Sequence, residues 1–140
     1  MKITYKLDKE KGAFVPVKAH KSDAGWDLFT PFPFTILPHS RMAIDTGVHF
    51  NIPDGWRAKL YSKSGLMAKK GITCRGLIDA GYTGPIIAVL FNHSDSPYFF
   101  GVGQKITQII FEENPDITLE ETDTLEETER GSGGLGSTGA

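Results

Sequence analysis

Short runs of β-branched and aromatic residues, separated by prolines and glycines, constrain the fold of this chain more than any other feature. Such runs are typical of β-strands, and a proline between two strands removes no hydrogen bond from a sheet. Seven prolines fall between the runs or at their ends, at positions 31, 33, 38, 53, 85, 97 and 115. Many short strands with close turn signals favour a closed all-β sandwich or barrel.

The runs predict nine strands and one short helix. The helix is expected over Ser64–Lys70, with Ser64 as its N-cap, and Leu77 and Ile78 are expected to end a further strand. The nine strands are expected over Lys2–Leu7, Trp26–Phe29, Phe34–Leu37, Arg41–Ile52, Trp56–Tyr61, Ile86–Phe91, Tyr98–Phe100, Lys105–Phe111 and Ile117–Glu120.

The length and the cysteine content restrict the class of protein. A chain of 140 residues is long enough for one domain with its own core. Its single cysteine, Cys74, excludes an internal disulfide framework and suits a reducing compartment. No apolar run approaches the ~20 residues of a membrane span, and the first residues do not resemble a signal peptide. We therefore expect a cytoplasmic protein, or one in a nuclear or viral context.

The charge is distributed unevenly along the chain. Residues 1–111 hold 14 Lys and Arg against 8 Asp and Glu, a net charge of +6. Residues 112–140 hold Arg130 alone against 9 acids, a net charge of −8. A basic body indicates an anionic ligand, although the acidic segment can equally be a solvated linker.

The composition predicts a barrel domain over residues 1–125 and a mobile arm over residues 126–140. The arm is rich in Gly, Ser and Thr and cannot bury enough apolar surface to offset its ordering entropy. Arg130 and the glycines and hydroxyl residues that follow it have the composition of a phosphate-binding loop. A flexible linker or an added tail would have a similar composition.

The stretch Gly76–Gly84 places a carboxylate and a tyrosine in one turn. Gly81 and Gly84 are expected to admit positive φ, which would hold Asp79 and Tyr82 at one end of a hairpin. A carboxylate there can deprotonate a water molecule, and a tyrosine ring can form the wall of a small pocket. An ordinary turn with an Asp beside a surface Tyr is the alternative.

Three further segments carry polar residues in apolar surroundings. Asp27 lies within an apolar strand and needs a partner, which can be a cation, a metal hydration shell or nearby backbone. Lys63, Ser64 and Gly65 open the predicted helix, where they form either an anion site or a plain N-cap. Alternation over the strand that starts at Lys105 puts Lys105 and Thr107 on one face and Gln108 on the other. Since the four histidines are widely spaced, a zinc site is not expected.

Five segments in one order give the chain its resemblance to a known family. They are Ala24–Leu28, Lys63–Leu66, Gly76–Gly84, Gly103–Gln108 and Arg130–Gly139. In this order the chain resembles the homotrimeric dUTPases, the deoxyuridine triphosphate nucleotidohydrolases. The resemblance implies a distorted jelly-roll β-barrel with one short helix and a flexible C-terminal arm. It also implies a trimer with shared active sites, and no membrane or stable nucleic-acid partner is expected.

The resemblance also implies a reaction and the residues that carry it out. The reaction is hydrolysis of dUTP to dUMP and pyrophosphate with magnesium, which keeps uracil out of DNA and supplies dUMP for thymidylate synthesis. Asp79 would activate the water, Tyr82 would exclude a ribose 2′-hydroxyl, and Asp27 would hold magnesium through water. Other substrate contacts would come from Lys63, Ser64, Gly65, Thr73, Gly76, Ile78, Gln108, Arg130, Leu135, Gly136, Ser137 and Thr138.

The chain departs from the family pattern at four places. Lys63 stands where an arginine is usual, so a point charge replaces a bidentate group. Lys105 also stands where an arginine is usual and Gln104 where an Asp is usual, so a local ion pair between these positions is expected to be lost. Leu135 stands where an aromatic ring commonly stacks on uracil. The segment Ile72–Arg75 is expected to be a short hairpin without the Asn that some family members use on the base, which leaves base recognition to backbone groups.

Two other functions fit the same resemblance. A related dCTP deaminase would share the barrel and the trimer, but residues 73–75 offer no carboxylate for deamination. A nucleotide-binding regulatory protein would keep the pocket without turnover. The presence of Asp27, Asp79 and Tyr82 favours the hydrolase.

Overall fold

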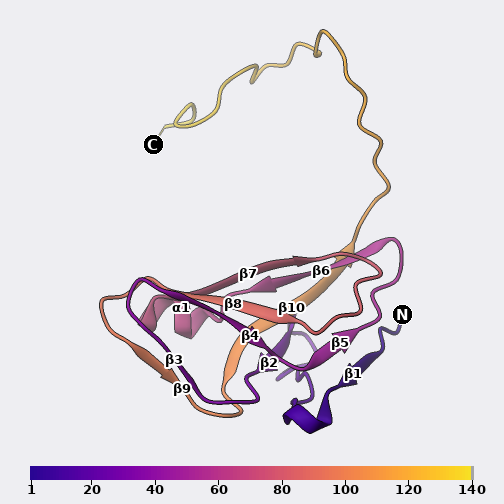
Figure 1. Cartoon of the computed structure of the whole chain (residues 1–140). Helices are drawn as coiled ribbons and strands as arrows, with labels where there is room; N and C mark the ends of the chain where they lie inside the picture. Colours follow the sequence, from indigo (N-terminus) through magenta and orange to yellow (C-terminus); the bar gives the residue numbers. More distant parts are fainter. Residues whose placement is uncertain (140) are drawn as a thin grey trace.

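The computed structural model describes residues 1–139 of the 140-residue chain, so Ala140, the last residue of the predicted arm, lies outside the described residues. The described part consists of antiparallel β-strands with one α-helix, α1 (Ser64–Lys70), and one 3-10 turn, η1 (Lys9–Lys11) (Figure 1). The predicted all-β class and the predicted bounds of the helix are confirmed. No helix among the described residues is long and apolar enough to cross a membrane.

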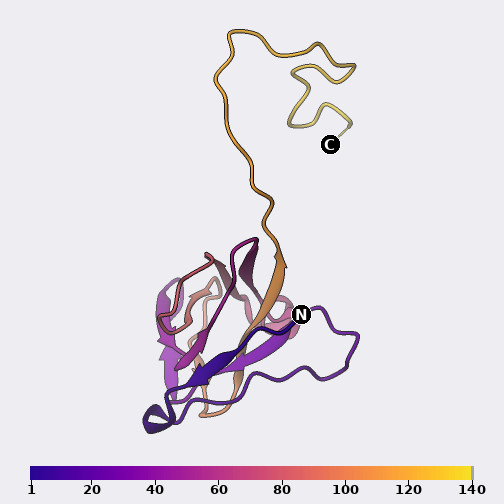
Figure 2. The same cartoon turned by 90° about the vertical axis from the view of Figure 1, so that its right-hand side faces the viewer.

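Six strands form one curled sheet, and two pairs of short strands complete the wall of a half-barrel (Figures 1 and 2). The short pairs are β1 (Tyr5–Leu7) with β5 (Val48–Phe50), and β3 (Phe34–Ile36) with β9 (Tyr98–Phe100). The order in the large sheet is β2 (Trp26–Phe29), β10 (Lys105–Glu113), β6 (Trp56–Tyr61), β7 (Ile72–Ile78), β8 (Ile87–Asn92) and β4 (Arg41–Asp45).

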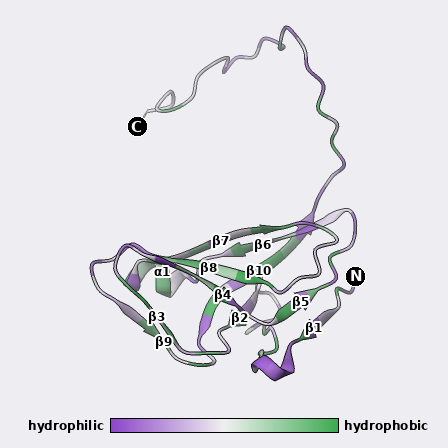
Figure 3. Ribbon diagram, in the orientation of Figure 1, coloured by the Kyte–Doolittle hydropathy of each residue, from purple (hydrophilic) through white to green (hydrophobic). Residues whose placement is uncertain are grey.

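The core lies inside the curl of the sheet. In the regular strands alternate residues point inward, as the period of two requires. On β6 these are Ala58 and Leu60, and on β8 they are Ala88 and Leu90. The hydropathy colouring shows hydrophobic and hydrophilic residues together on the barrel strands, and mainly purple and pale residues in the segment after them (Figure 3). The sheet packed around this core fixes the positions of the polar residues that lie at its strand ends.

Two predicted strands differ from the structure. The run Arg41–Ile52 is divided into β4 and β5, because Gly47 adopts a φ of 68° and turns the chain. Ile117–Glu120 is not a strand: β10 ends at Glu113, and the chain then leaves the barrel (Figure 2). A strand needs a neighbour for its backbone groups, and this segment has none among residues 1–139.

Candidate active site

Asp27 lies at the centre of a cluster that joins three of the five sequence segments. The residue is 6% exposed, and its carboxylate accepts a hydrogen bond from the Nζ of Lys63, at the start of α1. Its other oxygen, Oδ2, lies 2.9 Å from the Nζ of Lys105 at the start of β10. The partners of the Asp27 carboxylate in the structure are therefore two cations, Lys63 and Lys105.

The electrostatics of this cluster favour the ionised carboxylate. Burial of Asp27 opposes ionisation, but hydrogen bonds from Lys63 and Lys105 outweigh it and lower its pKa below the usual 3.8. Gln104 takes part in no ion pair among the described residues, in line with the expected loss of a local pair, whereas Lys63 and Lys105 both pair with Asp27. Gln104 instead donates to the hydroxyl of Tyr98 at 3.0 Å.

The register of β10 brings these segments together. β10 lies between β2 and β6, so that Gln108 stands opposite both Asp27 and Tyr61. The Nε2 of Gln108 donates to the carbonyl oxygen of Ser62 at 3.2 Å, which supplies the partner that a polar residue needs there. An irregularity in register between Lys105 and Thr107 breaks the expected alternation: Thr107 is buried and Lys105 reaches Asp27.

Ser64 and Gly65 form the exposed first turn of α1. The expected N-cap at Ser64 is wrong, because the N-cap residue is Lys63 and no side chain caps the helix. The first N–H groups of the helix therefore have no side-chain acceptor, and they face solvent beside the Asp27 cluster.

Asp79 and Tyr82 lie in the connection between β7 and β8, and both side chains are exposed. The amide of Tyr82 donates to the carbonyl oxygen of Asp79 at 3.3 Å, and the hydroxyl of Tyr82 donates to that of Pro85 at 2.9 Å. These bonds fold the turn on itself and leave Tyr82 44% exposed. Together with Leu77, Ile86 and Ile87, Asp79 and Tyr82 line a depression of about 210 Å³.

The two glycines of this turn have different roles. Gly81 has a φ of 80°, as predicted, and its amide donates to the carbonyl oxygen of Ile52 at 3.1 Å. Gly84 is not at positive φ, so that part of the prediction is wrong. A Cβ on Gly84 would lie 2.5 Å from the hydroxyl oxygen of Tyr82, so the absence of a side chain lets the ring cover the turn.

The predicted hairpin at Ile72–Arg75 is instead the first half of β7, a continuous strand of seven residues. Ile72, Cys74, Gly76 and Ile78 face inward, and Thr73, on the outer face, has its hydroxyl 2.7 Å from Nε2 of His93. The Ile78 side chain therefore belongs to the core, and any contact of Ile78 with a ligand would be through its backbone.

The second half of β7 offers backbone groups that no neighbouring strand uses. β7 pairs with β6 over Arg75–Ile78, whereas it pairs with β8 only over Ile72–Cys74 in the part of the chain that the structure describes. One edge of residues 76–78 is thus outside the ladder. Such N–H and C=O groups can recognise the edge of a flat polar ring.

The structure separates Asp79 from the Asp27 cluster within one chain. Along the β6–β7 ladder, Ile78 stands opposite Ala58 and Arg75 stands opposite Tyr61, three residues or about 10 Å away. Asp79 follows Ile78 at one end of the ladder, and Lys63 lies two residues after Tyr61 at the other end. Asp79 and Lys63 therefore lie past opposite ends of the ladder.

The arm residues also stand apart from both groups. Residues 114–139 contain no helix or strand, and the arm extends away from the barrel (Figures 1 and 2). Leu135 is fully exposed, and Arg130 donates through Nε to the carbonyl oxygen of Gly133 at 2.8 Å. In local turns, the amide of Ser137 donates to the carbonyl oxygen of Gly134, and the amide of Gly139 donates to that of Gly136. Gly136, Ser137 and Thr138 contact no barrel residue through hydrogen bonds among the described residues.

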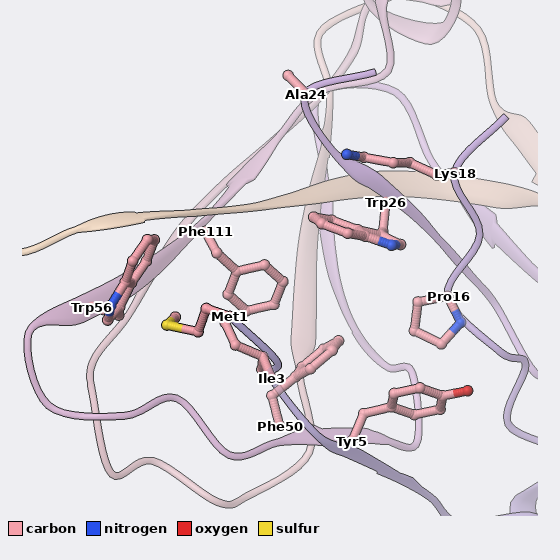
Figure 4. Close-up of a pocket in the computed structure, with 10 residues that line it drawn as sticks. All are labelled: Met1, Ile3, Tyr5, Pro16, Lys18, Ala24, Trp26, Phe50, Trp56 and Phe111. Carbon is pink, nitrogen blue, oxygen red and sulfur yellow. The ribbon is translucent and has the colours of Figure 1, made fainter. Parts of the chain in front are cut away.

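A cavity of about 440 Å³ is lined by none of the predicted site residues. It is an aromatic groove formed by Trp26, Phe50, Trp56 and Phe111 together with the N-terminal residues Met1, Ile3 and Tyr5 (Figure 4). The Nζ of Lys18 lies 4.1 Å from the centre of the Trp26 ring at one side of it. The groove contains no Asp, Glu, His or Cys, which makes it a poor candidate for hydrolytic chemistry.

Sequence reasoning missed Lys105 as a neighbour of Asp27, although Lys105 lies in a segment that it had selected. A strand irregularity determines where this side chain points, and the amino-acid pattern carries no signal for it. Arg75 is exposed on β7, where it borders a depression of about 340 Å³ with Lys59 and Tyr61.

Comparisons with known proteins agree with the arrangement of motifs. A family model described as dUTPase matches residues 12–139. The chain is 39% identical to the deoxyuridine 5′-triphosphate nucleotidohydrolase of Clostridium tetani over 98% of this chain and 96% of that protein. It is 38% identical to the corresponding protein of Yarrowia lipolytica over 92% of this chain and 84% of that protein.

Two solved structures share the fold. The dUTPase of Staphylococcus bacteriophage 80alpha with dUpNHpp superimposes with a TM-score of 0.92 at 27% identity and covers 99% of both chains. A mutant of the dUTPase from phage phi11 of S. aureus, solved with a structural Mg(II) ion, gives a TM-score of 0.83 at 24% identity. It covers 91% of this chain and 100% of that one.

Proposed function

The chain belongs to the dUTPase family and is a dUTP diphosphatase, and we propose that it hydrolyses dUTP to dUMP and pyrophosphate by attack of a water molecule that Asp79 deprotonates. The observation that carries the residue-level proposal is the turn that holds Asp79 beside Tyr82 over a small open depression. The carboxylate faces solvent there and can reach a water. Phosphoryl-type displacement requires positioning and charge neutralisation more than covalent chemistry.

Tyr82 is proposed to select deoxyribose over ribose. Its ring lies over Gly84 and is held by its hydroxyl at Pro85, so it presents a flat face at the mouth of the depression. A sugar packed on that face leaves no room for a 2′-hydroxyl. The unpaired edge of residues 76–78 would bind the base through backbone groups, and Thr73 lies farther along the same strand.

The Asp27 cluster is proposed to bind the triphosphate. Lys63 and Lys105 supply two cations, Gln108 supplies an amide, and Ser64 and Gly65 supply the first turn of a helix. These groups neutralise and orient phosphate oxygens. The arm then closes over the γ-phosphate with Arg130, Gly136, Ser137 and Thr138, while Leu135 contacts the base.

Magnesium fits this cluster only in a limited way. Among residues 1–139, no three His, Cys, Asp or Glu residues gather to hold a metal. Asp27 is a single carboxylate, which suits an ion that keeps its waters and takes its other ligands from phosphate oxygens. When bound, the ion would neutralise charge on the triphosphate, and Asp27 would hold it through water.

We also propose that the active site is shared between three subunits. Asp79 and Lys63 lie past opposite ends of the β6–β7 ladder, and the arm as far as Gly139 makes no hydrogen bond to either in its own chain. A neighbouring subunit can supply the missing part of each site. The exposed Ile117 and Leu119 and the aromatic groove of Figure 4 are apolar surfaces that such an interface would cover.

One assay tests the function against its alternatives. The protein is incubated with magnesium and dUTP, dCTP or UTP, and pyrophosphate and ammonia are measured. Pyrophosphate from dUTP alone is expected. Ammonia would indicate a deaminase, and the absence of both products would indicate a binding protein.

A further inference from the structure

His49 on β5 contacts the turn that carries Tyr82. Its Nδ1 lies 2.7 Å from the carbonyl oxygen of Thr83, and its Nε2 lies 2.9 Å from Oδ2 of Asp8. A carbonyl oxygen and a carboxylate both accept hydrogen bonds and donate none. Both ring nitrogens must therefore carry a proton for both bonds to form, and only the imidazolium has two.

The surroundings of His49 favour this charged form. The hydrogen bond to Asp8, followed by that to the Thr83 backbone, raises the pKa of His49 above 6.5, although burial and the charge of Lys6 on β1 oppose the increase. The hydrogen bond from His49 in turn lowers the pKa of Asp8. Lys11 of η1, whose Nζ is 3.7 Å from Asp8 and 3.1 Å from Asp45, is the other cation near the pair.

The contact matters because the turn has few other anchors. The backbone of Gly81 bonds to Ile52, and the Tyr82 hydroxyl bonds within the turn to Pro85. Among the described residues, His49 is the one side chain outside residues 79–85 that hydrogen-bonds to them. The His49 ring lies between Asp8 and Thr83, and 19% of the His49 side chain is exposed.

We propose that His49 is a positioning residue for Tyr82, and that the loss of one of its two protons loosens the turn and weakens nucleotide binding as the pH rises. The inference rests on the proposed role of Tyr82 at the sugar. Neutral His49 keeps one N–H, so it can donate to Asp8 or to Thr83 but not to both. The site is thereby coupled to a titrating group that touches no substrate.

The test compares binding of dUpNHpp with the titration of His49 itself. NMR of the imidazole in the full-length protein locates its pKa, and calorimetry gives the Kd of dUpNHpp on both sides of that pH. Losing one hydrogen bond is expected to raise Kd about three- to tenfold across the transition. His49→Gln, which cannot donate to both acceptors, should bind weakly at every pH and show no such step.

A second variant keeps the experiment informative if His49→Gln folds poorly. Asp8→Asn retains His49 but removes the carboxylate, so both the His49 pKa and the step in Kd should move to lower pH. His39→Asn, which alters an exposed His–Asp pair with an Nε2–Oδ1 distance of 2.7 Å, is the matched control and should leave the step unchanged. A step that persists in His49→Gln, or that stays in place in Asp8→Asn, overturns the proposal.

Amide exchange separates this proposal from the proposed function. Exchange at residues 81–84 of the free protein should be faster in His49→Gln than in the wild type below the His49 pKa, and equal above it. That readout needs no nucleotide, whereas failure of the wild type to hydrolyse dUTP would overturn the proposed function alone. Equal exchange at both pH values would show that His49 does not hold the turn.

Discussion

Lys63 and Asp27 form an ion pair that joins the first residues of α1 to β2, and Lys105 binds the second oxygen of the same carboxylate at 2.9 Å. The site thus holds one carboxylate between two cations before any phosphate is present. A triphosphate would offer the two lysines new partners. Asp27 therefore serves both the stability of the fold and the charge balance of the site.

Asp27→Asn is expected to destabilise the protein by about 1–3 kcal/mol at neutral pH, because two ammonium groups lose a buried carboxylate partner. The pKa of Asp27 is lowered in the folded state, so its stabilisation is fully present above pH 3.8 and is lost as the pH falls through the folded value. Urea unfolding of both proteins should give curves that converge in acid.

Glu112→Gln is the control for this prediction. Glu112 also bonds two cations, Arg57 and Lys59, but its side chain is 32% exposed, so solvent screens the pair and the effect should be smaller. A difference between wild type and Asp27→Asn that is the same at pH 3 and pH 7 would contradict the role assigned to the ionised carboxylate.

Asp79→Asn is expected to reduce kcat about 10²- to 10⁴-fold while dUpNHpp binding is retained, since the amide keeps the shape of the carboxylate but cannot take a proton from water. The side chain is exposed, so the melting temperature should not change. Pyrophosphate release and calorimetry measure the two effects. Normal turnover would assign the base to another residue.

Much of the fold follows from the sequence, because strand patterns are local. Trp26–Phe29, Trp56–Tyr61 and Tyr98–Phe100 have the predicted bounds, since turn residues close each of them. β7 was only partly recognised, because Thr73, Arg75 and Gly76 interrupt its apolar residues. The predicted strand at Ile117–Glu120 fails for the opposite reason: its pattern is suitable, but no strand in the described part of the chain lies beside it.

The candidate site was predictable in residue type and only partly in geometry. The segments around Asp27, Lys63 and Gln108 come together because β10 pairs with both β2 and β6, which a sequence pattern does not specify. The position of Lys105 depends on an irregularity in that pairing. His49 had no signal, because its partners are 41 and 34 residues away along the chain.

Deletion of residues 130–140 is expected to abolish most turnover and to leave the melting temperature unchanged, because the described arm residues make no hydrogen bond to the barrel. Mixing subunits tests whether sites are shared. The truncated protein and the Asp79→Asn variant, each nearly inactive, are unfolded together, refolded and assayed. If Asp79 and the arm of one site come from different subunits, about a quarter of the sites regain both parts.

The mixing experiment has a clear opposite outcome. If one subunit supplies both Asp79 and the arm to a site, no mixed site is complete and activity stays at the level of the separate variants. A monomer in solution, measured by light scattering, would also exclude sharing.

Tyr82→Ala is expected to lower the preference for dUTP over UTP about tenfold or more, because it removes the ring that we propose excludes a 2′-hydroxyl. Tyr82→Phe keeps the ring and loses only the bond to Pro85, so its preference should stay close to that of the wild type. The ratio of kcat/KM for the two nucleotides is the measurement. Equal ratios in Tyr82→Ala and the wild type would remove Tyr82 from sugar selection.

Leu135→Phe is expected to tighten binding. An aromatic ring stacked on uracil contributes about 1 kcal/mol beyond the contact that leucine makes, so KM for dUTP should fall about fivefold. Leu135 is fully exposed, so neither this variant nor Leu135→Ala should change the melting temperature. Leu135→Ala should raise KM. If both variants have the KM of the wild type, the arm closes without placing residue 135 over the base.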